Sequence, residues 1–110
     1  MSKTFLNLML TVGFEVFGTA CIQASRQFTV LLPSVGVFLG YGAAFWFLAL
    51  ALEKLPLGIV YATWSGAGIV LVTSVGYLVF GQKVDGAALL GMSMIIAGLL
   101  TMHLFSSTGL

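Results

Sequence analysis

The chain has 110 residues, of which 60% are hydrophobic and only 6% are charged, and its mean hydropathy is +1.16. Soluble domains usually carry about 25% charged residues, so this composition excludes a water-soluble globule. No nucleic-acid partner is expected at a net charge of +1.

Four apolar segments separate the charged residues, at positions 4–22, 33–52, 58–80 and 87–105. Each has about 20 residues, which at about 1.5 Å per residue spans a bilayer core of about 30 Å. A helix satisfies its own backbone hydrogen bonds, which lipid cannot do. The sequence therefore predicts an all-α membrane protein, with one domain of four transmembrane helices over residues 1–110.

The first segment carries a carboxylate, Glu15, in its middle. Polar side chains recur around it at every fourth position: Asn7, Thr11, Glu15, Thr19 and Gln23. On a helix, steps of four place neighbours on one face, and Gly18 lies on that face and opens space beside Glu15. Such a stripe is costly against lipid, so it should face other helices or a water-accessible cavity. Glu15 also disfavours a cleaved leader, because it interrupts the apolar run.

Two roles are open for this stripe. Hydroxyls such as Thr11 and Thr19 can hold helices together by hydrogen bonds, but that role does not require an ionisable Glu15. Desolvation disfavours a charged carboxylate, so Glu15 is expected to exchange protons near neutral pH and, once charged, to attract a cation. A site that takes either a proton or a cation suits exchange transport. The rival hypothesis is a non-transporting membrane subunit whose Glu15 pairs with a basic residue of a larger partner.

Aromatic residues of the second and third segments offer a complementary surface. Tyr41 and Phe45 lie one turn apart, and a second group follows i, i+3, i+4, i+7 spacing: Tyr61, Trp64, Ser65 and Gly68. Aromatic faces attract cations by about 0.5–2 kcal/mol each and accept apolar substituents. We therefore expect a pocket for a lipophilic cation, with an interfacial aromatic belt as the alternative role of these rings.

Glycines mark the last two segments. Gly66 and Gly68 either allow the third helix to bend, as alternating access requires, or serve close packing. Gly91 and Gly98 lie seven residues apart on one side of the fourth helix and indicate a packing seam, which we assign to a dimer contact. His103, the single histidine, is expected to be an interfacial polar residue. With no metal-ligand spacing, phosphate loop or nucleophile triad, neither an enzyme nor a cofactor is expected.

In their order along the chain, these fragments resemble the small multidrug resistance transporters, on the side of the quaternary-cation (EmrE-like, Qac) branch. The resemblance covers nearly the whole chain. It is carried by Glu15-Val16, Gly18-Thr19, Pro33-Ser34-Val35-Gly36, Pro56, Gly58, Tyr61-Ala62, Trp64-Ser65-Gly66, Gly68-Ile69-Val70, Gly81-Gln82, Asp85 and Ala97-Gly98. Phe17-Gly18 and Ser65 favour the drug branch, because the guanidinium-exporting branch tends to have Trp-Ala and Thr there.

The resemblance implies proton-coupled export of hydrophobic or quaternary organic cations across the bacterial inner membrane by an antiparallel homodimer. In that family the glutamate matching Glu15 is shared by protons and drug, and the proton gradient drives transport. Residues matching Tyr41, Phe45, Tyr61 and Trp64 line the drug chamber, those matching Thr19 and Ser65 lie near it, and Gly66 and Gly68 match a kink. Some relatives handle guanidinium or polyamines, and some pair non-identical subunits.

The loops show departures from that family and an even charge balance. The family commonly has Lys where this chain has Gln23 and Gly where it has Gln27, and it mostly lacks an acidic residue at the position of Glu53. With four spans, Lys3 and Lys54 fall on one side of the membrane, and Arg26 and Lys83 on the other. Because orientation follows the excess of Lys and Arg on the cytoplasmic side, two against two predicts insertion in both orientations.

Overall fold

The computed structural model describes residues 2–105, which fold into four α-helices and no strand within that range. The helices are α1 (Ser2–Ser25), α2 (Leu31–Leu52), α3 (Leu57–Phe80) and α4 (Gly86–Phe105). All four are long and apolar enough to cross a membrane. The predicted all-α, four-span architecture is confirmed. The main difference in bounds is α1, which begins two residues before and ends three residues after the predicted 4–22 segment.

Short polar turns join the helices. Asp85 Oδ1 accepts a hydrogen bond from the Ala88 backbone N–H at 2.9 Å, so Asp85 caps α4. The turn after α1 is less relaxed, because Arg26, Gln27 and Phe28 have φ of +50°, +62° and +65°. Residues other than glycine rarely adopt backbone angles in this left-handed region. A glycine at position 27 would adopt this backbone conformation without strain.

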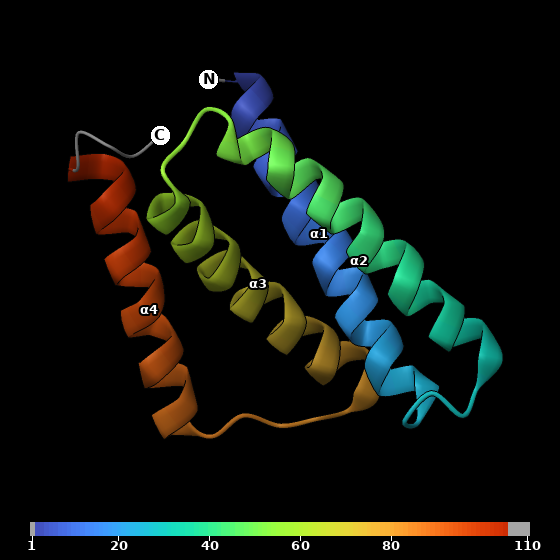
Figure 1. Ribbon diagram of the computed structural model, residues 1–110. Coiled ribbons are helices and arrows are strands. Elements are labelled where there is room, and N and C mark those ends of the chain that lie inside the picture. Colours follow the sequence, from blue (N-terminus) through green and yellow to red (C-terminus); the bar gives the residue numbers. More distant parts are fainter. Residues whose placement is uncertain (1, 106–110) are drawn as a thin grey trace.

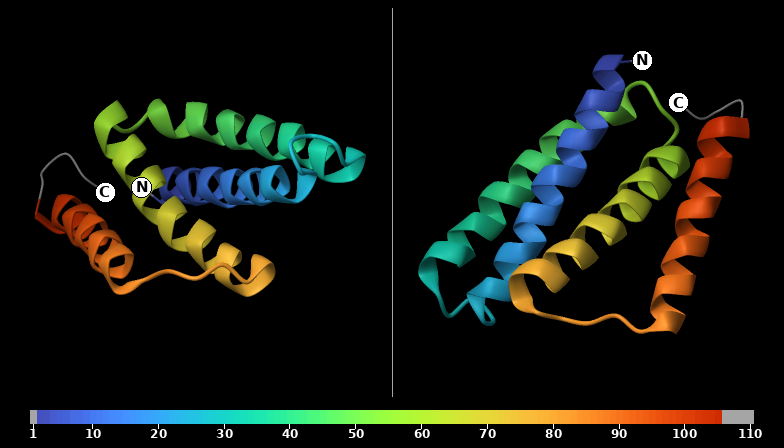
Figure 2. Two further views of the ribbon diagram at one scale, coloured as in Figure 1. Left: turned by 90° about the horizontal axis from the view of Figure 1, so that it is seen from below. Right: turned by 180° about the vertical axis from the view of Figure 1, so that it is seen from behind.

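The α1 helix lies between α2 and α3, whereas α4 contacts only α3 among the described helices (Figures 1 and 2). Glycines allow α1 and α2 to approach each other closely. A Cβ added at Gly40 would lie 2.9 Å from the Gly18 Cα and 3.0 Å from the Phe14 carbonyl oxygen. Small residues let membrane helices approach closely enough for van der Waals packing along their backbones.

The helices form a flat slab of 45 × 35 × 18 Å instead of a closed bundle. Its buried core is small, built around Leu8, Ala51 and Val60. Many large apolar side chains are exposed, and none of the described residues of α4 is buried. Both faces of the slab therefore suit contact with lipid or with another apolar protein surface.

The two ends of the slab carry different turns. The start of α1, the end of α4 and the α2–α3 turn lie at one end, and the other two turns lie at the opposite end (Figure 1; Figure 2, right). Lys3 and Lys54 thus belong to one end, and Arg26 and Lys83 to the other. The equal division of basic residues predicted from the sequence holds in the fold.

Candidate functional site

The carboxylate of Glu15, halfway along α1, lies against α3 and is joined to α2 through Thr19. Thr19, one turn later on the same helix, donates its hydroxyl hydrogen to Glu15 Oε1 at 2.8 Å. The Tyr41 hydroxyl of α2 lies 2.6 Å from Thr19 Oγ1. Since the single Thr19 hydrogen is used on Glu15, Tyr41 donates to Thr19. The result is a hydroxyl chain from α2 through Thr19 to the carboxylate.

Gly68 brings α3 to the other carboxylate oxygen. A Cβ added at this buried glycine would lie 3.4 Å from Glu15 Oε2. Because Gly68 has no side chain, the carboxylate can lie directly against α3. A larger residue at position 68 would occupy the space next to the charge.

A pocket of about 410 Å³ opens beside this carboxylate. It is lined by Glu15, Thr19, Tyr61, Trp64, Ser65, Gly68, Ile69 and Val72. One wall carries the carboxylate and the Thr19 hydroxyl, and the other carries the two aromatic rings of α3. The structure therefore brings together the polar stripe of α1 and the aromatic face of α3, which lie about 50 residues apart in the chain. A group with positive charge and apolar substituents would be complementary to both walls.

The aromatic rings form a continuous series from this pocket to α2. Trp64 meets Tyr61 edge-on, with ring centroids 5.6 Å apart, and meets Phe45 edge-on at 6.5 Å. Phe45 then stacks with Tyr41 at 6.1 Å. Tyr41 and Phe45 thus stand behind the pocket lining and support Trp64 and Thr19. Edge-to-face pairs of this kind restrict ring orientation.

Besides Tyr41 and Phe45, two further residues expected at the pocket, Thr11 and Gly18, are not among its lining residues. Thr11 is fully buried between helices, and its hydroxyl donates to the Asn7 carbonyl at 3.0 Å. Gly18 faces the Tyr41 ring, which would lie 3.3 Å from a Cβ at that position. Gly18 therefore makes room for Tyr41 and does not open space beside the carboxylate. Both residues act on the site through helix packing.

The remaining predicted glycines divide between packed and open positions. A Cβ at Gly66 would lie 2.8 Å from a methyl carbon of Leu99, so Gly66 serves the contact of α3 with α4. The α3 helix is continuous from Leu57 to Phe80. The predicted bend at Gly66 and Gly68 stays a prediction, and their contacts favour the packing alternative in this conformation. Gly91 and Gly98 have nothing within 4 Å of a Cβ and stand open on α4.

His103 and Gln82 make contacts that the sequence did not indicate. His103 Nε2 lies 2.6 Å from Thr63 Oγ1, and Thr63 donates its hydroxyl hydrogen to the Ile59 carbonyl. His103 Nε2 is then the donor, and the bond joins α4 to α3. Gln82 Nε2 donates to Gln23 Oε1 at 3.3 Å, which joins the α3–α4 turn to the end of α1. No local pattern marks either pair, because each joins residues 40 or more positions apart.

Comparison with known proteins places this geometry in a family. The model of the Small Multidrug Resistance protein family matches residues 3–95. The chain is 48% identical over 92 residues to the multidrug transporter EmrE of Escherichia coli (strain K12), covering 84% of each chain. It is 47% identical over 102 residues to a multidrug transporter of Pseudomonas aeruginosa, covering 93% of each. It is 41% identical over 104 residues to the quaternary ammonium compound-resistance protein QacE of Escherichia coli, covering 94% of each.

The chain belongs to the small multidrug resistance family, which confirms the resemblance drawn from its motifs. Together with its four spanning helices, this membership makes it a multi-pass protein of the bacterial inner membrane.

Proposed function

We propose that this protein exports lipophilic and quaternary organic cations in exchange for protons. The relatives are named as multidrug transporters and as a quaternary ammonium resistance protein. The observation that carries the proposal is the position of Glu15. This carboxylate lies mid-helix in a membrane span and opens onto a pocket whose other wall is Tyr61 and Trp64. No lysine or arginine of the described residues lies at that depth, since the lysines and Arg26 stand at helix ends or in the turns.

Competition between the cation and the proton for the Glu15 carboxylate couples cation export to proton import. A cation binds when Glu15 is charged, with its positive centre near the carboxylate and its apolar substituents against the aromatic wall. A proton that binds Glu15 removes the charge and weakens the cation's hold. A proton and a cation cannot occupy Glu15 together. The site therefore carries a cation when it turns outward and a proton when it turns inward.

We infer that a second copy of the chain in the opposite orientation completes the pocket. The pocket is lined by residues of α1 and α3 alone, in a slab 18 Å thick, so we expect one side of it to be open in a single chain. The equal division of basic residues between the two ends supplies both orientations in one membrane. In such a dimer two Glu15 carboxyls share one site.

The test is binding of tetraphenylphosphonium to the purified protein across a range of pH. We expect affinity to fall as the pH decreases, because protons compete for Glu15. Glu15→Gln should nearly abolish binding and remove cation-driven proton release. Glu53→Gln, which neutralises an exposed acid in the α2–α3 turn, is the matched control and should bind as the unaltered protein does.

Three outcomes would count against the proposal. If Glu15→Gln releases protons normally on cation addition, Glu15 is not the shared site. Absence of binding to the unaltered chain would favour the non-transporting subunit. Binding of guanidinium or a polyamine in preference to tetraphenylphosphonium would redirect the substrate class.

A further inference from the structure

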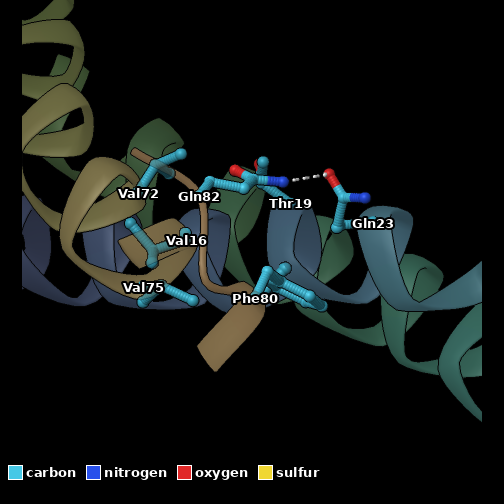
Figure 3. A pocket seen from close by; sticks show the side chains of 9 residues that line it. Val16, Thr19, Gln23, Val72, Val75, Phe80 and Gln82 are labelled. Carbon is cyan, nitrogen blue, oxygen red and sulfur yellow. Dashed lines mark hydrogen bonds between the residues drawn. The ribbon is translucent and has the colours of Figure 1, made fainter. Parts of the chain in front are cut away.

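A second, smaller cavity lies between α1 and α3 (Figure 3). Its volume is about 70 Å³, and its lining is Val16, Thr19, Ala20, Gln23, Val72, Val75, Gly76, Phe80 and Gln82. Thr19 and Val72 line both spaces. The small cavity therefore extends from the hydroxyl that touches Glu15 toward the α3–α4 turn.

A pair of glutamine side chains lies at the outer end of this cavity. Gln82 Nε2 donates to Gln23 Oε1 at 3.3 Å, across the gap between the α3–α4 turn and α1 (Figure 3). The backbone holds Gln82 there, because Gly81 adopts φ +68° and the Gln82 N–H donates to the Gly76 carbonyl at 2.9 Å. The side chain rests on bare glycine, since a Cβ at Gly76 would lie 2.8 Å from Gln82 Oε1.

The cavity has the size and the polar groups that water needs. About 10–15 Å³ accommodates one water molecule when it finds two to four polar partners, so about 70 Å³ has room for several. The Thr19 hydroxyl supplies partners at the inner end, and the two amides supply them at the outer end. The walls between are apolar, and no acidic or basic residue is among the lining residues.

Resting on the proposed function, we infer that this cavity is a proton path separate from the cation pocket, and that the Gln23–Gln82 pair closes its outer end. The need for such a path follows from the geometry of exchange. When a cation enters the larger pocket, it stands between the Glu15 carboxyl and the open side of that pocket. The proton that leaves Glu15 then requires a route that does not pass the cation, and Thr19 leads into one.

Each transfer along this route conserves the hydroxyl groups. When Glu15 is protonated, its O–H becomes the donor to Thr19 Oγ1, and the Thr19 hydrogen, which points to the charged carboxylate in the structure, turns to water in the cavity. The carboxyl then gives its proton to Thr19 Oγ1 as Thr19 gives its own hydrogen to that water. Water carries the excess proton outward. Neutral amides neither hold nor release a proton at ordinary pH, so the Gln23–Gln82 pair acts by blocking water until the two side chains separate.

Two variants test the inference at its two ends. Ala20→Leu places an apolar side chain in the cavity, away from the residues proposed to hold the cation. Gly76→Ala adds a Cβ 2.8 Å from Gln82 Oε1, so the Gln82 amide must shift, and we expect that shift to break its bond to Gln23 while every polar group of the pair is kept. Gly58→Ala is the matched control, because it makes the same change on α3 where nothing lies within 4 Å of the added Cβ.

Rapid mixing with tetraphenylphosphonium compares two signals, tryptophan fluorescence for cation binding and a pH-indicator dye for proton release. We expect Ala20→Leu to delay proton release behind binding by about tenfold or more, because an apolar plug removes the polar partners of the moving charge. In vesicles without cation, Gly76→Ala should raise the proton leak several-fold above Gly58→Ala at unchanged cation affinity.

The inference is overturned if Ala20→Leu binds the cation and releases protons with no delay. It is equally overturned if Gly76→Ala leaks no faster than Gly58→Ala, and this measurement decides alone should Ala20→Leu fail to fold. Both results differ from failure of the proposed function, in which the unaltered protein itself binds no cation or releases no proton.

Discussion

Trp64 offers the sharpest test of the aromatic wall. Its indole lines the pocket opposite Glu15 and is held by edge-on contacts with Tyr61 and Phe45. A cation over an aromatic face gains about 0.5–1 kcal/mol when exposed and about 2 kcal/mol when desolvated. Because Trp64 is half-buried, we take about 1–2 kcal/mol as its contribution. At about 1.4 kcal/mol per factor of ten, Trp64→Ala should weaken tetraphenylphosphonium binding by about 5- to 30-fold.

Equilibrium binding of radiolabelled tetraphenylphosphonium measures this loss, with two further variants for comparison. Trp64→Phe keeps an aromatic face and should lose less affinity than Trp64→Ala. Trp46→Ala removes the other indole, which is 67% exposed and outside the pocket lining, and should leave affinity unchanged. The pH response should persist in all three, because Glu15 is intact. Full affinity in Trp64→Ala, or an equal loss of affinity in Trp46→Ala, would refute the proposed contact between Trp64 and the cation. Trp64 would then serve only helix packing.

Three other predictions concern packing, backbone and topology. Gly40→Ala should lower the unfolding temperature in detergent, by overpacking worth about 1–3 kcal/mol against the Gly18 backbone, whereas Gly42→Ala, with nothing within 4 Å, should not. Gln27→Gly should raise that temperature, because it removes about 1–2 kcal/mol of strain from a residue other than glycine in the left-handed region. The greater freedom that glycine gives the unfolded chain offsets only part of this gain. A lower unfolding temperature would contradict the turn geometry. Lysines added to the turns at one end, or at the other, should each abolish drug resistance, and co-expression should restore it; full resistance from one orientation alone would exclude the antiparallel dimer.

The four spans and the carboxylate in the middle of the first span could be predicted from sequence because they depend on local properties. Run length and hydropathy determine whether a segment crosses the bilayer, and Glu15 stands in the middle of such a run. Helical periodicity also indicated correctly that Tyr61, Trp64, Ser65 and Gly68 share a face, which lines one pocket in the structure. The Asp85 cap of α4 is a local property of the same kind, because capping involves only neighbouring residues.

Contacts between helices were decided only by the tertiary structure. Periodicity placed Thr11 and Gly18 on the stripe of Glu15, but it could not show that Thr11 would be fully buried or that α2 would lie against Gly18. The reason is that helix crossing depends on how two surfaces interlock, as where Gly18 lies against Gly40. The same limit hid the Tyr41–Thr19 bond and the Gln23–Gln82 pair, whose members are 22 and 59 residues apart. Sequence alone therefore determined which groups enter the membrane, because hydropathy is a property of a single segment. Helix packing decided which of those groups touch, because a contact depends on the surfaces of two helices.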